Sequence, residues 1–253
     1  MNDHEVARHI ARRAGDLLAA IRVDSPGLPS RELAALGDRA AHELCLELFR
    51  EFRPSDVVLS EEGELDPARN DHDRLWIIDP LDGTSHYSSR GADYAVHIAL
   101  WERDSQSLSN ISAASVYVPE TGVMLSMDDV VIPSIARAEA IRILVSRTRP
   151  PREIDKIAVE LQSETGRSID VVPMGSVGAK VAEIIAGHAD MYINTGGFHE
   201  WDLAAPLGVA HHYGLTVCDR DGNHVEFNQP DTIIQNAVIT RSQFVPTLIH
   251  SLA

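Results

Sequence analysis

Residues Leu75–Tyr87 read LWIIDPLDGTSHY and combine a short apolar run with two aspartates. Four apolar residues run directly into Asp79, and a second aspartate, Asp82, follows three positions later. A short apolar run bounded by Pro and Gly is typical of a buried strand. Gly83 allows the chain to turn tightly at the end of that strand. The strand is therefore predicted to carry both carboxylates to the place where the chain turns.

This arrangement predicts a metal site. Pro80 has a fixed φ and no amide proton, so we expect it to end the strand and let Asp82 curl back toward Asp79. The backbone carbonyl of Leu81 is expected to point to the same centre. Carboxylate and carbonyl oxygens are the hard ligands that Mg²⁺ prefers.

The residues after Asp82 predict an anion site beside the metal. The N–H groups of Gly83, Thr84 and Ser85 are expected to form a nest for phosphate, especially if a helix begins there. An alternative interpretation is a plain aspartate-rich turn with a capping threonine, because Asp, Pro and Gly are all common in turns.

Two further segments bring acidic residues to the ends of predicted elements. Glu61 and Glu62 follow the apolar run DVVLS, and Asp202 lies in HEWDLAAP, where a helix is predicted to begin. Taken alone, the glutamates fit a solvated surface pair, and Asp202 fits a cap or a partner of the helix dipole. Together, three segments converge on the same chemistry.

The first half of the chain reads as helices followed by strands. Apolar residues at helical spacing predict helices over 2–22 and 32–52. Alternating and continuous apolar runs predict strands over 56–60, 75–79, 94–102, 111–119 and 122–127. This order is an α+β pattern, which we assign to a domain of residues 1–140 that carries most of the candidate metal ligands.

The second half, residues 141–253, alternates strands and helices and predicts an α/β domain that supplies Asp202 and the substrate-side residues. Strands are expected over 141–146, 169–173, 189–194, 215–218 and 236–240. Helices are expected over 150–161, 176–187, 200–214 and 242–252.

Composition excludes several function classes. The formal charge of -16 and the lack of a basic stripe argue against binding a nucleic-acid polymer or an anionic membrane. No apolar run is long enough to cross a membrane, and no signal-peptide pattern begins the chain. The two cysteines, Cys45 and Cys218, form no metal motif and suit a reducing compartment. A cytoplasmic protein is therefore predicted.

The ordered set Asp38, Glu61–Glu62, DPLDGT and Trp201-Asp202 makes the chain resemble the inositol monophosphatase family. Members are Mg²⁺-dependent, Li⁺-sensitive phosphatases with a layered α/β/α/β/α sandwich fold. The segments WIIDPLDGT, AVHIALW, GSVGAK and WDLAAP look most like the CysQ-type branch of 3′(2′),5′-bisphosphate nucleotidases. That branch removes the 3′-phosphate of 3′-phosphoadenosine 5′-phosphate.

The resemblance implies a role for each matching residue. The metal ligands, for about two or three Mg²⁺ ions, would be Glu61, Asp79, Asp82, Asp202 and the Leu81 carbonyl. The catalytic residues, which orient the attacking water, would be Glu61, Thr84 and Asp38. By the resemblance, the substrate-binding residues would be Gly83, Thr84, Ser176 and Lys180. Two further candidates come from the residues themselves: Ser85 from the predicted amide nest, and His199 from its place just before Trp201-Asp202. The resemblance also suggests a homodimer, because dimers are common in the family.

The sequence leaves other functions open. Ser85, His86 and Tyr87 replace the residues that follow DGT in the CysQ-type branch, so another small phosphorylated substrate, such as an inositol phosphate, sugar phosphate or nucleoside phosphate, is an alternative. Alternatives from other classes are an inactive relative that binds phosphate or metal, and an acidic interaction module. Clustered unpaired carboxylates are costly without a metal, which disfavours the non-catalytic readings.

Overall fold

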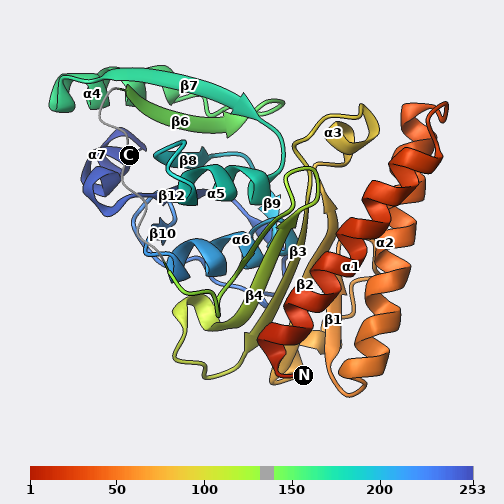
Figure 1. The fold of residues 1–253 in the computed structure, drawn as a ribbon. Coiled ribbons are helices and arrows are strands. Elements are labelled where there is room, and N and C mark those ends of the chain that lie inside the picture. The colour runs from red at the N-terminus through yellow and green to blue at the C-terminus, as the bar shows by residue number, and fades with distance from the viewer. Residues whose placement is uncertain (132–139, 253) are drawn as a thin grey trace.

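The computed structural model describes residues 1–131 and 140–252, which form five alternating layers (Figure 1). Helices α1 (Asp3–Asp24) and α2 (Ser30–Phe52) cover the outer face of a first sheet. Helices α5 (Val177–Ile185) and α6 (Glu200–His212) lie between this sheet and a second one. Helices α4 (Ile154–Thr165) and α7 (Val245–Leu252) cover the far face of the second sheet. The predicted layered fold class is confirmed.

The first sheet has the strand order β1-β2-β3-β4-β5. β1 runs parallel to β2, and the remaining neighbours are antiparallel. The strands are β1 (Val57–Ser60), β2 (Arg74–Asp82), β3 (Ala95–Glu102), β4 (Ile111–Val118) and β5 (Val123–Ser126).

The second sheet is mixed, with the order β10-β12-β8-β6-β7. Its strands are β6 (Ala140–Ser146), β7 (Ser168–Met174), β8 (Met191–Asn194), β10 (Thr216–Cys218) and β12 (Ala237–Thr240). A short separate pair joins β9 (Phe198–His199) to β11 (Ile233–Ile234). The sequence did not predict this pair, because two-residue strands carry no periodicity.

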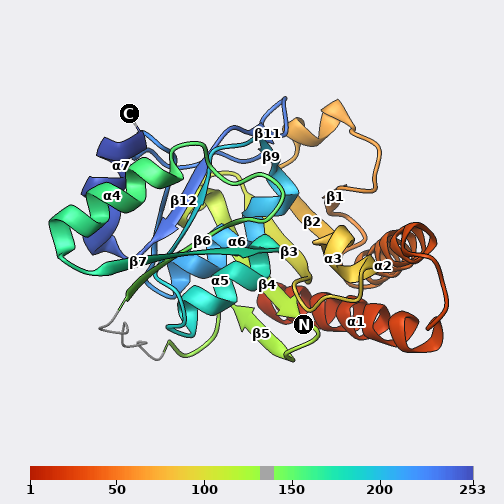
Figure 2. The same cartoon turned by 90° about the horizontal axis from the view of Figure 1, so that it is seen from above.

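The continuous apolar run in β2 is explained by its position between two helical layers. Trp76 and Ile78 pack under α1 and α2, whereas Leu75 and Ile77 pack toward α5 and α6. Successive side chains of a strand point to opposite faces, so a strand covered on both faces must be apolar at every position. Seen from above, α1 and α2 lie at one end of the molecule and α4 and α7 at the other (Figure 2).

Most predicted helices and strands are confirmed within a few residues, and two differences matter. Pro80 does not end its strand, because β2 continues through Asp82. Helix α4 begins at Ile154, later than the predicted start at residue 150. A short helix, α3 (Thr84–Ser88), begins directly after Gly83, as the anion-nest interpretation required.

The shorter helical turns η1 (Pro67–Asp71), η2 (Leu108–Asn110) and η3 (Ser242–Phe244) lie in connections between longer elements. The middle layer contains core residues from both predicted halves, so the two halves share one packed interior.

In the described part of the chain, no helix is both long and apolar enough to cross a membrane. The predicted homodimer and cytoplasmic location stay predictions.

We expect Gly178→Ala to test how closely α5 packs on the first sheet. A Cβ at this position would lie 2.4 Å from His97 Nε2, 2.7 Å from Val116 Cγ1 and 2.9 Å from the Ala95 Cβ. Overpacking of this kind should lower the free energy of unfolding by about 1–3 kcal/mol, measured by urea denaturation. The control is Gly196→Ala, where a Cβ meets nothing within 4 Å and no loss is expected. Equal stability of both variants would contradict the close packing.

Candidate metal centre and active site

An irregularity in β2 brings Asp79 and Asp82 to the same side of the strand. In a regular strand, residues three positions apart point to opposite faces. Here the register shifts, because Asp79 pairs with His97 and Asp82 pairs with Ala95, so three steps on β2 oppose two on β3. A bulge of this kind re-aims a side chain. Pro80 lies inside the irregularity, where its missing amide proton interrupts no regular pairing.

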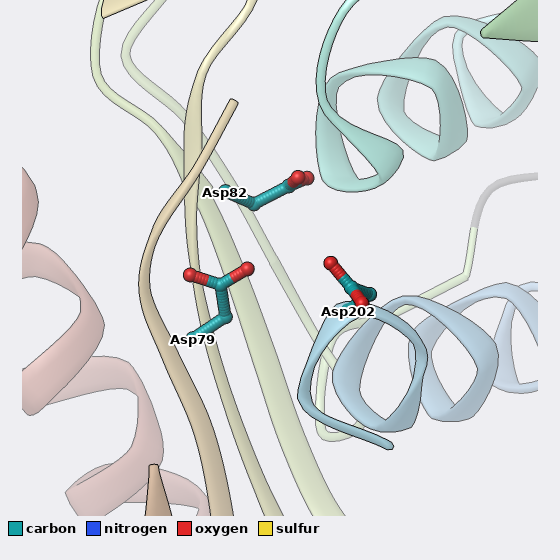
Figure 3. Close-up of side chains that lie close together, drawn as sticks. All are labelled: Asp79, Asp82 and Asp202. Carbon is teal, nitrogen blue, oxygen red and sulfur yellow. The ribbon is translucent and has the colours of Figure 1, made fainter. Parts of the chain in front are cut away.

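A third carboxylate completes the cluster from another layer. One oxygen each from Asp79, Asp82 and Asp202 lies within 4.8 Å of the others. Figure 3 shows the two β2 aspartates projecting toward Asp202 at the start of α6. The Asp202 carboxylate also accepts a 2.7 Å hydrogen bond from the His199 amide, which fixes it at the first turn of the helix. The three predicted aspartates therefore converge.

Glu61 lies beside Asp79 because β1 and β2 are parallel. Ser60 pairs with Ile78, and the amide of Glu61 continues the ladder with a 3.4 Å hydrogen bond to the Ile78 carbonyl. The carboxyl ends of parallel strands meet at one edge, so the two acidic residues arrive together. Glu61 keeps exposed surface, but its carboxyl group lies among the neighbouring carboxylates and is partly desolvated there, whereas Asp79 is fully buried.

The crowding of these carboxylates shifts their pKa values upward. Burial, and then Glu61, Asp82 and Asp202, raise the pKa of Asp79 well above its usual value. Burial and then Asp82 raise the pKa of Asp202 to about 8. Burial and nearby carboxylates raise the pKa of Glu61 to about 7. Like charges at this spacing resist ionisation together, so the site favours a cation.

Asp82 also accepts hydrogen bonds from the second half of the chain. Its Oδ2 accepts hydrogen bonds from the Ser176 hydroxyl at 2.6 Å, from the Val177 amide and from the Gly178 amide at 3.2 Å. His97 Nε2 lies 3.2 Å from the same oxygen. The amides belong to the start of α5, where the helix dipole favours a negative charge. One carboxylate therefore joins β2 to α5.

The turn after Asp82 requires glycine. Gly83 has φ of 88°, and a Cβ there would lie 2.6 Å from the Asp93 carbonyl. The Thr84 hydroxyl that follows lies 3.1 Å from the Leu81 carbonyl and 3.3 Å from Asp38 Oδ1. Burial and then Glu62 raise the pKa of Asp38 to about 6. The predicted catalytic threonine and aspartate are thus in contact.

A cavity of about 180 Å³ opens beside the carboxylate cluster. Asp82 and Asp202 line it, together with four of the predicted substrate-binding residues. These four are Gly83, Ser85, Ser176 and Lys180.

Lys180 lies buried in the cavity wall, whereas His199 lies outside the cavity lining. Lys180 is 2% exposed, and its ammonium donates a 2.9 Å hydrogen bond to the Ser176 carbonyl and lies over the Tyr192 ring. Burial lowers its pKa to about 8. His199 does not line the cavity: its ring stacks on Trp201, and its Nδ1 lies 2.8 Å from the Thr232 hydroxyl. A substrate contact for His199 stays a prediction.

Sequence reasoning missed Arg147 and Arg149, which line the same cavity. Arg147 donates to Asp93 at 3.1 Å, and Arg149 lies 4.9 Å over the Phe198 ring. A weak signal was present, because Arg147 directly follows the strand that ends at Ser146 and Arg149 is two residues further on, in a strongly acidic chain. Their closeness to Asp82 depends on how the two sheets meet, which no local pattern encodes.

The donor set fits a divalent metal ion. Among the described residues, Asp79 Oδ2 is buried without a hydrogen-bond partner. A buried, unpartnered carboxylate oxygen is costly unless it is protonated or bound to a cation. With Asp82 and Asp202 so close, hard oxygen ligands surround one point, as a magnesium-type ion requires.

Comparison with known proteins agrees with this geometry. Residues 4–252 match the inositol monophosphatase family. A 3′-phosphoadenosine 5′-phosphate phosphatase of Mycobacterium bovis is 39% identical over 244 residues, covering 95% of this chain and 89% of the relative. The 3′(2′),5′-bisphosphate nucleotidase CysQ of Escherichia coli is 26% identical, covering 89% of this chain and 94% of that protein.

The fold also matches solved structures. The crystal structure of CysQ from Bacteroides thetaiotaomicron superposes with a TM-score of 0.78 at 23% identity, covering 94% of this chain and 97% of that one. At 23% identity, this structural similarity supports the fold and not a shared substrate.

The raised carboxyl pKa values predict how stability depends on pH. Asp202 has a usual pKa of 3.8 and a folded pKa of about 8, so the folded chain holds a proton that the unfolded chain releases. Its stabilising contribution is complete below the lower value and is lost as pH rises through the higher one. In chelator, Asp202→Asn should therefore gain thermal stability relative to the parent chain as pH rises from about 5 to 8.

Magnesium should remove this difference. At about pH 8, Mg²⁺ should raise the unfolding temperature of the parent chain more than that of Asp202→Asn, because ligand binding stabilises the folded state. Calorimetric scans at both pH values, with and without MgCl₂, make the measurement. A pH-independent difference between the two proteins would contradict the clustered carboxylates.

Proposed function

Because the chain belongs to the inositol monophosphatase family, we propose that it removes the 3′-phosphate of 3′-phosphoadenosine 5′-phosphate with Mg²⁺ as cofactor. Hydrolysis of phosphate monoesters follows from the family. The observation that carries the finer proposal is the meeting of three carboxylates with a cavity edged by arginines. The names of the mycobacterial and CysQ relatives support the same substrate.

The metal ligands would come from β2, the end of β1 and the start of α6. They are Glu61, Asp79, Asp82, Asp202 and the Leu81 carbonyl. Bound there, Mg²⁺ would offset the carboxylate charges, acidify an attacking water and stabilise the leaving oxygen. Binding of the cation would also lower the carboxyl pKa values, because it favours the ionised forms.

The protein's own part in the reaction is to hold the phosphate and the water. The Thr84 hydroxyl lies within hydrogen-bond distance of two acceptors, the Leu81 carbonyl and the Asp38 carboxylate, so its proton is directed toward one of these two oxygens. Asp38, with a pKa of about 6, suits a proton acceptor near neutral pH. The amides of Gly83, Thr84 and Ser85 would bind the scissile phosphate, with no covalent nucleophile from the protein.

The far side of the cavity suits a second negative group. Arg149 is exposed at the cavity and is held by the Gly197 carbonyl at 3.3 Å and by the Phe198 ring. Lys180, which is almost fully buried, supplies a further cation in the cavity wall. In a chain with a formal charge of -16, positive side chains gathered at the cavity indicate a substrate with an anionic group beyond the scissile phosphate. A bisphosphate nucleotide meets this requirement.

We expect phosphate release to be fastest with 3′-phosphoadenosine 5′-phosphate and to stop in excess chelator. A panel with inositol 1-phosphate, fructose 1,6-bisphosphate and histidinol phosphate, assayed with and without MgCl₂, measures this. Faster release from an inositol or sugar phosphate would replace the nucleotide proposal. Activity that persists in excess chelator would contradict the proposed requirement for Mg²⁺. Asp82→Asn, which removes one proposed ligand, is the control for contaminating phosphatases.

Arg149→Met should separate the two phosphates of the substrate. Losing a charge-assisted contact costs about 1.5–3 kcal/mol, so kcat/KM for the bisphosphate should fall roughly ten- to a hundredfold. With 3′-AMP, which has no 5′-phosphate, the loss should be small. The control is Arg152→Met, an exposed arginine outside the cavity lining. Equal losses on both substrates would show that Arg149 serves the scissile phosphate or the fold.

A further inference from the structure

A buried polar bridge lies behind the start of α6, outside the lining of the cavity. It consists of Arg69, Asn228 and Glu200, which are 3%, 8% and 1% exposed. No sequence pattern singled out these residues, and the proposed chemistry does not use them. Burial of charged side chains is costly and contributes little net stability compared with apolar packing. Stability alone therefore does not explain why these side chains are buried here.

Each group in the bridge is hydrogen-bonded. Both oxygens of Glu200 accept backbone amides, one from Asn228 and one from Gln229, each at 2.8 Å. Arg69 donates to the Asn228 side-chain oxygen at 2.9 Å and to the Gln229 carbonyl at 2.5 Å. Asn70 donates to both oxygens of Asn228. A buried network satisfied in this way specifies one arrangement of the segments that it joins.

The bridge fixes the rotation of the first turn of α6. Glu200 is the first residue of the helix, and Asp202 is two positions later. At 3.6 residues per turn, the two side chains point about 200° apart, on opposite sides of the helix. Holding Glu200 to the loop of residues 228–229 therefore turns Asp202 toward β2. The Glu200 amide adds a 2.9 Å bond to the Thr232 carbonyl.

The other end of the bridge reaches the connection that carries Glu61. Arg69 lies in η1, between β1 and β2, and Glu61 is the first residue after β1 in the same connection. The bridge thus ties the Glu61 segment to the helix of Asp202. Asn228 bonds to both Arg69 and Glu200. Its φ of 58° is left-handed, a conformation that Asn adopts more readily than most residues.

We propose that Arg69, Asn228 and Glu200 are positioning residues that hold Asp202, and with it the Glu61 connection, at the spacing that binds the metal ion. This inference rests on the proposed function, because it takes the carboxylate cluster to be the Mg²⁺ site. Groups that orient metal ligands without touching the metal commonly change affinity or activity by about 10–100-fold when they are removed.

The test is calorimetric titration of the substrate-free protein with MgCl₂. Asn228→Gly keeps the left-handed backbone but removes the side chain that receives Arg69. It should weaken Mg²⁺ binding about tenfold. The Mg²⁺ concentration needed for half-maximal hydrolysis should rise in parallel, whereas KM for the substrate at saturating Mg²⁺ should stay unchanged. The matched control is Asn110→Gly, the same replacement at φ of 60° on η2, which should bind Mg²⁺ like the parent chain.

Glu200→Gln tests the same bridge from the helix side. Its effect should not add to that of Asn228→Gly, because residues of one network are coupled. Thermal unfolding in chelator separates a general loss of stability from a loss of metal affinity. A lowered unfolding temperature with unchanged Mg²⁺ affinity in Asn228→Gly would overturn the inference and leave the bridge structural. A parent chain that bound no Mg²⁺ would overturn the proposed function and this inference together.

Discussion

The structure depends on holding like charges together. Asp79, Asp82 and Asp202 present oxygens within 4.8 Å of one another, and repulsion between ionised carboxylates opposes that arrangement. Only rigid elements can impose it. Two of the side chains come from a strand buried on both faces and the third from the first turn of a helix packed between two sheets. A bound cation would relieve this repulsion. Because the cation binds only the folded arrangement, its binding would stabilise the folded state.

The same side chains also connect the two sheets. Asp82 receives the first amides of α5, and α5 in turn carries Lys180 to the cavity. A hydrogen-bonded carboxylate of the cluster thus links β2 to the first turn of α5. Apolar packing on both sides of α5 and α6 supplies most of the stabilisation, since burial of apolar surface is the dominant favourable term in folding.

Charge distribution explains how so acidic a chain would accept an anion. The charges of the carboxylate cluster would be offset by a cation bound among them. On the other side of the cavity, Arg147 is held by Asp93 and Arg149 by Phe198 and the Gly197 carbonyl. Cations held in place before the substrate arrives lose less conformational entropy on binding it. The net charge therefore says little about the charge inside the cavity.

Residue patterns alone predicted the α+β and α/β halves, most helices and strands, and the aspartates of the carboxylate cluster, whereas the layered sandwich was expected from the family resemblance. Local patterns sufficed, because apolar periodicity and Pro-Gly punctuation reflect contacts that each segment makes wherever it lies. Three features are visible only in the folded chain: Pro80 lies within a bulge, Lys180 is buried, and Arg147 and Arg149 line the cavity. These features depend on contacts between segments far apart in the chain, and local residue patterns do not encode such contacts.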